Sequence, residues 1–344
     1  MITPLYPDLS QAAGWLPLAF LVVMGLAMLA YVILDGYDLG VGILMRHAND
    51  AEKDIMIASI GPFWDANETW LVLGVGILLV AFPTAHGQIL GALYFPVAIM
   101  LLGLILRGVA FDFRVKAHAQ NKPAWNRAFH IGSILAAFSQ GFMLGMLVLG
   151  FQTSFWSYAF ASLIGLCLMA AYCLLGATWL LMKSEGQLQI KAATWARRSL
   201  WLAGVGIATI SIVTPFASPS IAEKWFSFPN FILLFPIPMI TAILFWWIDR
   251  ILKRLPAQLV QANQRWIWTP FASTVGIFFL AFHGLAYSLF PYLIIDKITI
   301  WQAASAPESL MIIFVGACIV LPVIIAYTVM AYRIFWGKAT LLEY

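Results

Sequence analysis

WLPLAFLVVMGLAMLAYVILDGYDL (Trp15–Leu39) is an apolar stretch whose only charged residues, Asp35 and Asp38, come near its end. Its 25 residues exceed the roughly 20 that an α-helix needs to cross about 30 Å of hydrocarbon. The stretch therefore predicts a transmembrane helix. The residues before it contain no Lys or Arg, so the basic region that begins a secretory signal peptide is missing. We expect this helix to stay in the mature protein.

The composition extends this prediction to the rest of the chain. Of its 344 residues, 62% are hydrophobic and 10% are charged, whereas soluble domains are about 45–50% apolar and about 25% charged. So few charged side chains cannot cover a soluble protein of this size. The net charge of +4 does not indicate a nucleic-acid partner, because the basic residues are not clustered in one tract.

The cysteines give no sign of a disulfide or a metal site. Cys167, Cys173 and Cys318 lie inside apolar runs, without CxxC spacing and without a neighbouring His. We expect three buried, unreactive thiols.

Nine stretches are long and apolar enough to cross the membrane as helices. The segments between them are short, and none is rich in Gly and Ser. We therefore predict a single all-α, polytopic membrane domain over residues 1–344. Its predicted spans are roughly 15–39, 59–82, 88–111, 128–150, 158–182, 199–217, 229–249, 267–292 and 309–335.

Small residues at GxxxG spacing predict close contacts between helices, because they leave one helix face without large side chains. Three such patterns occur in or between the predicted spans: Gly36/Gly40, Gly87/Gly91 and Gly141/Gly145.

The positions of the cations predict the orientation. Sixteen of the 19 Lys and Arg residues follow spans one, three, five, seven and nine, whereas only Lys224 and Lys297 lie on the opposite side. Cytoplasmic loops carry such an excess of cations. We therefore expect a periplasmic N-terminus and a cytoplasmic C-terminus.

Ionisable side chains inside a span are expensive, at about 2.5–3.5 kcal/mol each on insertion scales, and normally face protein or a water-filled cavity. Six such residues lie near the predicted cytoplasmic ends of the first three spans: Asp35, Asp38, Asp65, Glu68, Arg107 and Asp112. The first four form two pairs with i,i+3 spacing, which puts both carboxylates of a pair on one helix face. We expect the six side chains to form one cluster.

Two interpretations of this cluster compete. In the first, Arg107 neutralises one or two carboxylates and the ion network only fixes the helix register, while Asp112 and Glu68 reach the headgroups. In the second, the carboxylates and water carry protons inward from the cytoplasm. The excess of carboxylates over the single Arg leaves charge uncompensated and makes proton exchange plausible. The charges alone leave both interpretations open.

His283 is the one histidine well inside a predicted span. A lone buried His is more often a hydrogen-bonded core residue than a metal ligand. The chain has no second buried His with which to hold a haem between two imidazoles, so we predict no metal ligands here and leave the role of His283 open.

The stretches LDGYDLGVGIL (Leu34–Leu44), IMIASIGPFWDANETWLV (Ile55–Val72) and LRGVAFDFR (Leu106–Arg114) together resemble subunit II of the cytochrome bd quinol oxidases. The resemblance continues in LFPYLI (Leu289–Ile294) and VLPVIIAYTVMAYRIFWG (Val320–Gly337), and it is weakest between about residues 150 and 265. The short chain and the segment GPFWDANETW look closest to the cyanide-insensitive branch of that family.

The resemblance implies a subunit of a respiratory oxidase in the bacterial inner membrane, whose complex oxidises quinol and reduces oxygen to water. Haem b and haem d are expected mainly in a haem-bearing subunit I, with a small accessory subunit as a further candidate partner. Subunit II has nine helices in this family, is needed for haem assembly, and holds a structural quinone or lipid in some members. No residue of this sequence assigns such a molecule.

The resemblance also implies a proton pathway from the cytoplasm through subunit II. It carries over to Asp38 and Asp65, with Asp35 and Glu68 beside them, and to Arg107 and Asp112 as charge partners. Trp64 is expected near the subunit interface. No residue is expected to take part directly in catalysis. Because the family pathway and the charge pattern meet at the same residues, proton supply is favoured over a purely structural network.

A proton-coupled membrane transporter is the alternative function, since nine spans with intramembrane carboxylates would also suit a carrier. Carriers usually show paired repeats and charges at the middle of the membrane. Here we find no repeat, and the charges lie at one end of the helices.

The orientation can be tested with alkaline phosphatase fusions, because this enzyme is active only outside the cytoplasm. A fusion after the C-terminus is expected to be inactive, and a fusion at Ser220 is expected to be active. The reverse pattern of activities would contradict the predicted orientation.

Overall fold

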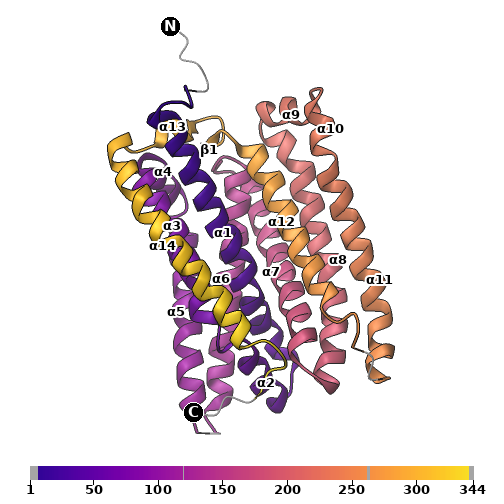
Figure 1. Ribbon diagram of the computed structural model, residues 1–344. Coiled ribbons are helices and arrows are strands. Elements are labelled where there is room, and N and C mark those ends of the chain that lie inside the picture. The colour runs from indigo at the N-terminus through magenta and orange to yellow at the C-terminus, as the bar shows by residue number, and fades with distance from the viewer. Residues whose placement is uncertain (1–6, 119, 262–263, 341–344) are drawn as a thin grey trace.

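The computed structural model describes residues 7–118, 120–261 and 264–340. Within these ranges, nine helices are long and apolar enough to cross a membrane, as the sequence predicted. They run side by side in one bundle (Figure 1). The long helices are α1 (Ala12–Leu44), α3 (Trp64–Ala81), α5 (Tyr94–Lys116), α6 (Lys122–Val148), α7 (Phe155–Lys183), α8 (Gly186–Ala217), α11 (Pro236–Val260), α12 (Thr269–Leu289) and α14 (Pro307–Ile334).

Short elements occupy the two ends of the bundle. The helix α2 (Asp50–Ile60) lies at the end where α14 finishes, which we name the α2 end, and the 3-10 turn η1 (Met45–His47) leads into it (Figure 1). The other short elements are α4 (Pro83–Ala92), α9 (Pro219–Phe226), α10 (Asn230–Leu234), α13 (Ile300–Ala303) and the antiparallel pair β1 (Tyr292–Ile294) and β2 (Ile298–Thr299).

The predicted span boundaries were wrong at two turns. The predicted span 59–82 begins in α2, which is separate from α3 because the chain turns at Gly61–Phe63. The predicted span 88–111 begins in α4, and the membrane helix α5 starts only at Tyr94. Neither turn contains a charged residue, so charge does not mark the break.

Close helix contacts confirm two of the three GxxxG predictions. A Cβ at Gly40 of α1 would overlap the Tyr172 carbonyl oxygen of α7, and a Cβ at Gly141 of α6 would lie 2.7 Å from the Gly165 Cα. Only glycine permits such approaches. The prediction for Gly87 and Gly91 was wrong, because they lie on the short helix α4 with open space around them.

These contacts place the end of α1 inside the bundle. α1 contacts α3, α6, α7, α12 and α14, and every residue from Asp35 to Gly42 is buried. The charged part of the first predicted span is therefore enclosed by other helices and kept from lipid.

The prediction of three buried cysteines was partly wrong. Cys167 and Cys173 are buried in α7, but Cys318 is exposed on α14. The reason is that α14 packs on the bundle along a narrow stripe, and Leu310 is its only buried residue within the part of the chain described.

Ion pairs and hydrogen bonds fix α2 across the bundle end. The side chain of Asn49 accepts from the Glu52 backbone N–H, and the Glu52 carboxylate accepts from the Asn49 backbone N–H, each at 2.8 Å. Lys191 of α8 donates to the same carboxylate at 2.8 Å. Burial raises the pKa of Glu52, but these hydrogen bonds outweigh it and hold the pKa below its ordinary value of 4.5.

We predict that Glu52→Gln lowers the stability of the protein at neutral pH by about 1 kcal/mol, because it weakens the capping box and the ion pair together. A depressed pKa contributes stability that is full above the ordinary value and is lost as the pH falls through the lower folded value. The difference in thermal unfolding midpoint between Glu52→Gln and the unaltered protein should therefore be present at pH 7 and shrink below about pH 4.

Glu223→Gln is the control, since Glu223 is exposed on α9 and is expected to leave the midpoint unchanged at both pH values. A Glu52→Gln difference that is the same at pH 7 and pH 4 would contradict the assigned role of the carboxylate.

Candidate functional site

A buried ion network joins three of the long helices. Arg107 Nη1 of α5 lies 2.6 Å from Asp35 Oδ1 of α1, and both side chains are fully buried. Arg107 Nη2 lies 3.3 Å from Glu68 Oε1 of α3, whose side chain is 26% exposed. One guanidinium thus holds carboxylates from two other helices.

Glycines at the α5–α6 contact set the position of Arg107. A Cβ at Gly103 would lie 2.8 Å from the Ala136 backbone nitrogen, and a Cβ at Gly132 would lie 2.9 Å from the Arg107 backbone nitrogen. With no side chains between them, the two backbones approach closely. The guanidinium extends away from this contact to Asp35 of α1.

Asp38 is held separately, by an amide. Asn67 of α3 is 1% exposed, and its Nδ2 donates to Asp38 Oδ2 at 2.8 Å and to the Tyr37 hydroxyl at 3.0 Å. The Tyr37 and Tyr332 hydroxyls are 2.6 Å apart, and the Tyr332 hydroxyl donates to Asn67 Oδ1 at 3.2 Å. Asn67, Tyr37 and Tyr332 therefore form a closed ring of hydrogen bonds, which we name the amide–tyrosine ring.

The cluster contains more carboxylates than cations, and several of its polar atoms lack a hydrogen-bond partner. Asp35, Asp38 and Glu68 lie around one guanidinium, and Asp38 has no ion pair of its own within the described residues. In the same part of the chain, Asp35 Oδ2, Asp38 Oδ1 and Arg107 Nε are buried without a partner. Buried polar groups normally bind water when protein offers them no partner, so these atoms fit a small hydrated site.

The structure brings together four of the six charged residues that the sequence singled out. Asp65 lies exposed in the first turn of α3, and Asp112 lies exposed on α5, without an ion pair in the part of the chain described. Trp64 is half-buried, with its ring 5.0 Å from that of Phe111 of α5. The carboxylates of Asp65 and Asp112 are therefore outside the buried ion network.

Sequence reasoning missed the uncharged members of the site. Asn67 and Tyr37 lie inside the motifs already quoted, between the charged residues that drew attention. Their spacing could have placed them on the same helices as those charged residues. Tyr332 also lies in a quoted stretch, Val320–Gly337, but nothing there indicates that it meets Asn67. Gln140 of α6 was missed as well: it donates to the Tyr31 hydroxyl and accepts from the Tyr172 hydroxyl, both at 2.7 Å.

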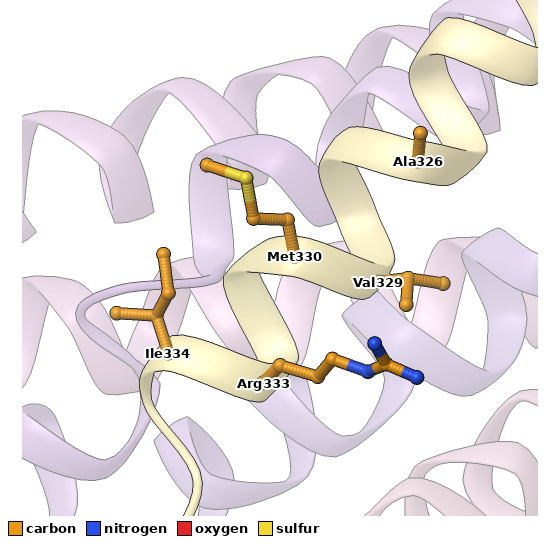
Figure 2. A pocket seen from close by; sticks show the side chains of 5 residues that line it. All are labelled: Ala326, Val329, Met330, Arg333 and Ile334. Carbon is orange, nitrogen blue, oxygen red and sulfur yellow. The ribbon is translucent and has the colours of Figure 1, made fainter.

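Other features of the molecule do not form a comparable site. A shallow groove on α14 is lined by Ala326, Val329, Met330, Arg333 and Ile334, which all project from one helix (Figure 2). A single helix face does not enclose a ligand.

His283 is exposed, and its Nδ1 lies 2.8 Å from the Phe279 carbonyl oxygen. The described residues contain no cluster of three or more His, Cys, Asp or Glu fit for a metal.

Comparison with known proteins identifies the family. The model of the family "Cytochrome bd terminal oxidase subunit II" matches residues 16–335. This chain belongs to that family. Subunit II chains of this kind are parts of a bacterial terminal oxidase and cross the membrane several times, as the resemblance of the motifs implied.

Relatives and a solved structure agree with this membership. The chain is 25% identical over 339 residues to cytochrome bd ubiquinol oxidase subunit 2 of Bacillus subtilis (strain 168), covering 91% of this chain and 94% of the relative. It is 26% identical over 365 residues to cytochrome bd-I ubiquinol oxidase subunit 2 of Escherichia coli (strain K12), covering 93% and 94%. A chain of the bd oxidase structure from Geobacillus thermodenitrificans shares its fold, with a TM-score of 0.76 and 18% identity over 93% of this chain and 98% of that one.

We predict that Arg107→Leu destabilises this subunit II by about 3–5 kcal/mol, because it leaves Asp35 as a buried, unpaired carboxylate. The midpoint of thermal unfolding and the haem content of the purified complex should both fall. Arg127→Leu is the control, since Arg127 is exposed near the start of α6 and its loss should change stability by less than about 0.5 kcal/mol. Equal midpoints for the two variants would rule out a buried ion network at Arg107.

Proposed function

We propose that this chain is subunit II of a ubiquinol-oxidising terminal oxidase and that it delivers protons from the cytoplasm toward the site of oxygen reduction. Family membership and the names of the Bacillus and Escherichia relatives support the first part. One observation carries the second part: three carboxylates lie around a single buried guanidinium, with unpartnered oxygens on two of them among the described residues. Carboxylate oxygens without a protein partner can bind water and can take up and release protons.

The haems are assigned to the partner, subunit I, and this chain supports their assembly by packing against that subunit. Haem iron is commonly held by buried imidazoles. All five histidines of this chain lie in its described part, and none of them is buried. The chain therefore does not fit a haem held by its own histidines, and no step of the proposal passes through one.

The proposed orientation puts the α2 end in the cytoplasm. The excess of Lys and Arg in the loops that follow the odd-numbered spans supports it. In this orientation the exposed Asp65 and the half-buried Glu68 lie on the side from which the protons come.

The proposed route runs from the surface of α3 to the buried end of α1. Asp65 is exposed at the N-terminal turn of α3, where the helix dipole favours a carboxylate. Glu68 follows one turn later on the same face and contacts Arg107. Arg107 joins Glu68 to Asp35, and Asp38 lies one turn nearer the α2 end on α1, beside Asn67. Water between these groups would complete the relay, in which Asp38 and Asp65 exchange protons with water.

The partner is proposed to cover the outer faces of α3 and α5. Side chains such as Val72, Leu102 and Ile105 are more than 60% exposed there, and Asp65 and Asp112 are exposed among them. Carboxylates are unfavourable against lipid, so a protein subunit suits this face better. Trp64, which lies between α3 and α5, is placed to contact it.

A proton-coupled transporter is not supported as the function. The family match assigns the chain to oxidase subunits, and its buried charges are not distributed over two repeats at the middle of the membrane.

We predict that Asp65→Asn slows oxygen consumption by the purified oxidase about tenfold or more, because an amide cannot take up and release the proton. The reduced-minus-oxidised haem spectrum should stay the same, since Asp65 lies outside the buried ion network. Asp50→Asn is the matched control: Asp50 is an exposed carboxylate at the α2 end that pairs only with Lys53 among the described residues, and turnover should stay within about twofold.

Two results would contradict the proposal. If turnover and the haem spectrum of Asp65→Asn both survive, the residue carries no protons. If both are lost because subunit I no longer copurifies, the role of Asp65 is structural.

A further inference from the structure

The amide–tyrosine ring has a fixed direction of hydrogen bonding. Tyr37 accepts from Asn67, so its own hydrogen is free for the Tyr332 oxygen, 2.6 Å away. Tyr332 in turn donates to Asn67 Oδ1. Each hydroxyl thus donates once and accepts once, and no donor is left over.

The Asp38 carboxylate fixes the orientation of the amide, and the orientation of the amide sets the direction of the ring. If the amide flipped, its oxygen would face the Asp38 carboxylate and the Tyr37 hydroxyl, and its NH2 group would face Tyr332. The carboxylate would then lose its donor, and two oxygens would meet at 2.8 Å, the distance that now joins Asn67 Nδ2 to Asp38 Oδ2. Asn67 is 1% exposed, so water cannot replace the lost bonds at low cost.

The two oxygens of Asp38 are therefore unlike. Oδ2 accepts from the fixed amide, a charge-assisted hydrogen bond. Oδ1 is buried and has no partner among the described residues, as is true of Asp35 Oδ2 one turn earlier on α1. The charged groups that act on Asp38 are Asp35 on its own helix, Glu68 of α3 and Arg107 of α5, while α14 contributes the Tyr332 hydroxyl.

We propose that Asn67 is a positioning residue for Asp38, which occupies Oδ2 and leaves Oδ1 as the atom that takes up and releases the proton. This inference rests on the proposed function, in which Asp38 is a relay carboxylate. In each transfer, Oδ1 takes the excess proton from a protonated water on one side, which becomes neutral, and gives it to a neutral water on the other, so the carboxylate returns to its starting charge.

The amide–tyrosine ring also prevents a second proton path that would lead away from Asp38. An amide N–H does not give up its proton to a neighbour, and both hydroxyl protons of the ring are engaged within it. Protons that reach Asp38 therefore do not continue through Tyr37 and Tyr332 toward the end of α14. The ring holds Asp38 without conducting protons.

The test uses the purified oxidase, with both subunits and its haems, and two readouts. The first is the infrared band of the Asp38 carboxyl group, identified as the band lost in Asp38→Asn. The second is the rate of oxygen consumption. Asn67→Leu keeps the approximate shape of the side chain and removes its donors, and Asn67→Ser serves where the leucine variant does not assemble.

We expect either Asn67 variant to shift the Asp38 band and to slow turnover about tenfold, because a hydrogen bond to a charged group is lost. The double variant with Asp38→Asn should be no slower than Asp38→Asn alone, since both changes act on one group. Gln140→Leu is the matched control, because Gln140 is also an amide between two tyrosines but makes no hydrogen bond to Asp38. It should leave the Asp38 band in place.

The outcomes separate this inference from the proposed function. An Asp38 band that does not move in the Asn67 variants overturns the positioning role, whatever the turnover. Independent, multiplying effects of Asn67→Leu and Asp38→Asn overturn it as well. A third outcome is that the band shifts but the Asp38→Asn oxidase consumes oxygen at the normal rate. The proposal that Asp38 supplies protons is then wrong, and so is the proposed role of Asn67 in that supply.

Discussion

The ion pair between Arg107 and Asp35 is the interaction on which the rest of this half of the bundle depends. Both side chains are fully buried, and separating such a pair leaves a charge that the interior cannot solvate. Helices α1 and α5 must therefore lie within reach of the Arg107 side chain, although they are far apart in the sequence. Glycines make this approach feasible: Gly40 lets α1 lie on α7, and Gly132 lets α6 lie on α5. The buried ion pair thus forms only because glycines on these helices allow close packing.

Around this pair the chain uses uncharged groups to hold the remaining acids. An amide lies between two tyrosines twice, at Asn67 of α3 and at Gln140 of α6. Fully satisfied polar networks of this kind fix the relative positions of helices and add no charge that would need desolvation. Asp35 Oδ2, Asp38 Oδ1 and Arg107 Nε are among the buried polar atoms that remain without a hydrogen-bond partner in the described part of the chain.

The sequence predicts most of the architecture, because nine apolar stretches and the uneven distribution of cations are strong signals. It also predicts the meeting of Asp35, Glu68 and Arg107, since charges in the membrane must find each other. Prediction from the sequence fails at turns and helix contacts that no charged or polar residue marks. The turns before α3 and α5 lie in apolar sequence, and Gly87 has the spacing of a contact residue but lies on a short surface helix. Tyr332 looks like any aromatic residue near a helix end until the fold brings it to Asn67.

The amide–tyrosine ring constrains how the sequence of this protein can evolve. Tyr37 and Asn67 are 30 residues apart, whereas Tyr332 is 265 residues beyond Asn67. Loss of any one of the three leaves a buried donor or acceptor on another, at a cost of about 1–3 kcal/mol. Replacement by apolar side chains is tolerable only when the positions change together. The three residues, which come from three helices, are therefore coupled in evolution. A series of single substitutions that replaces the ring with apolar side chains must include a less stable intermediate protein.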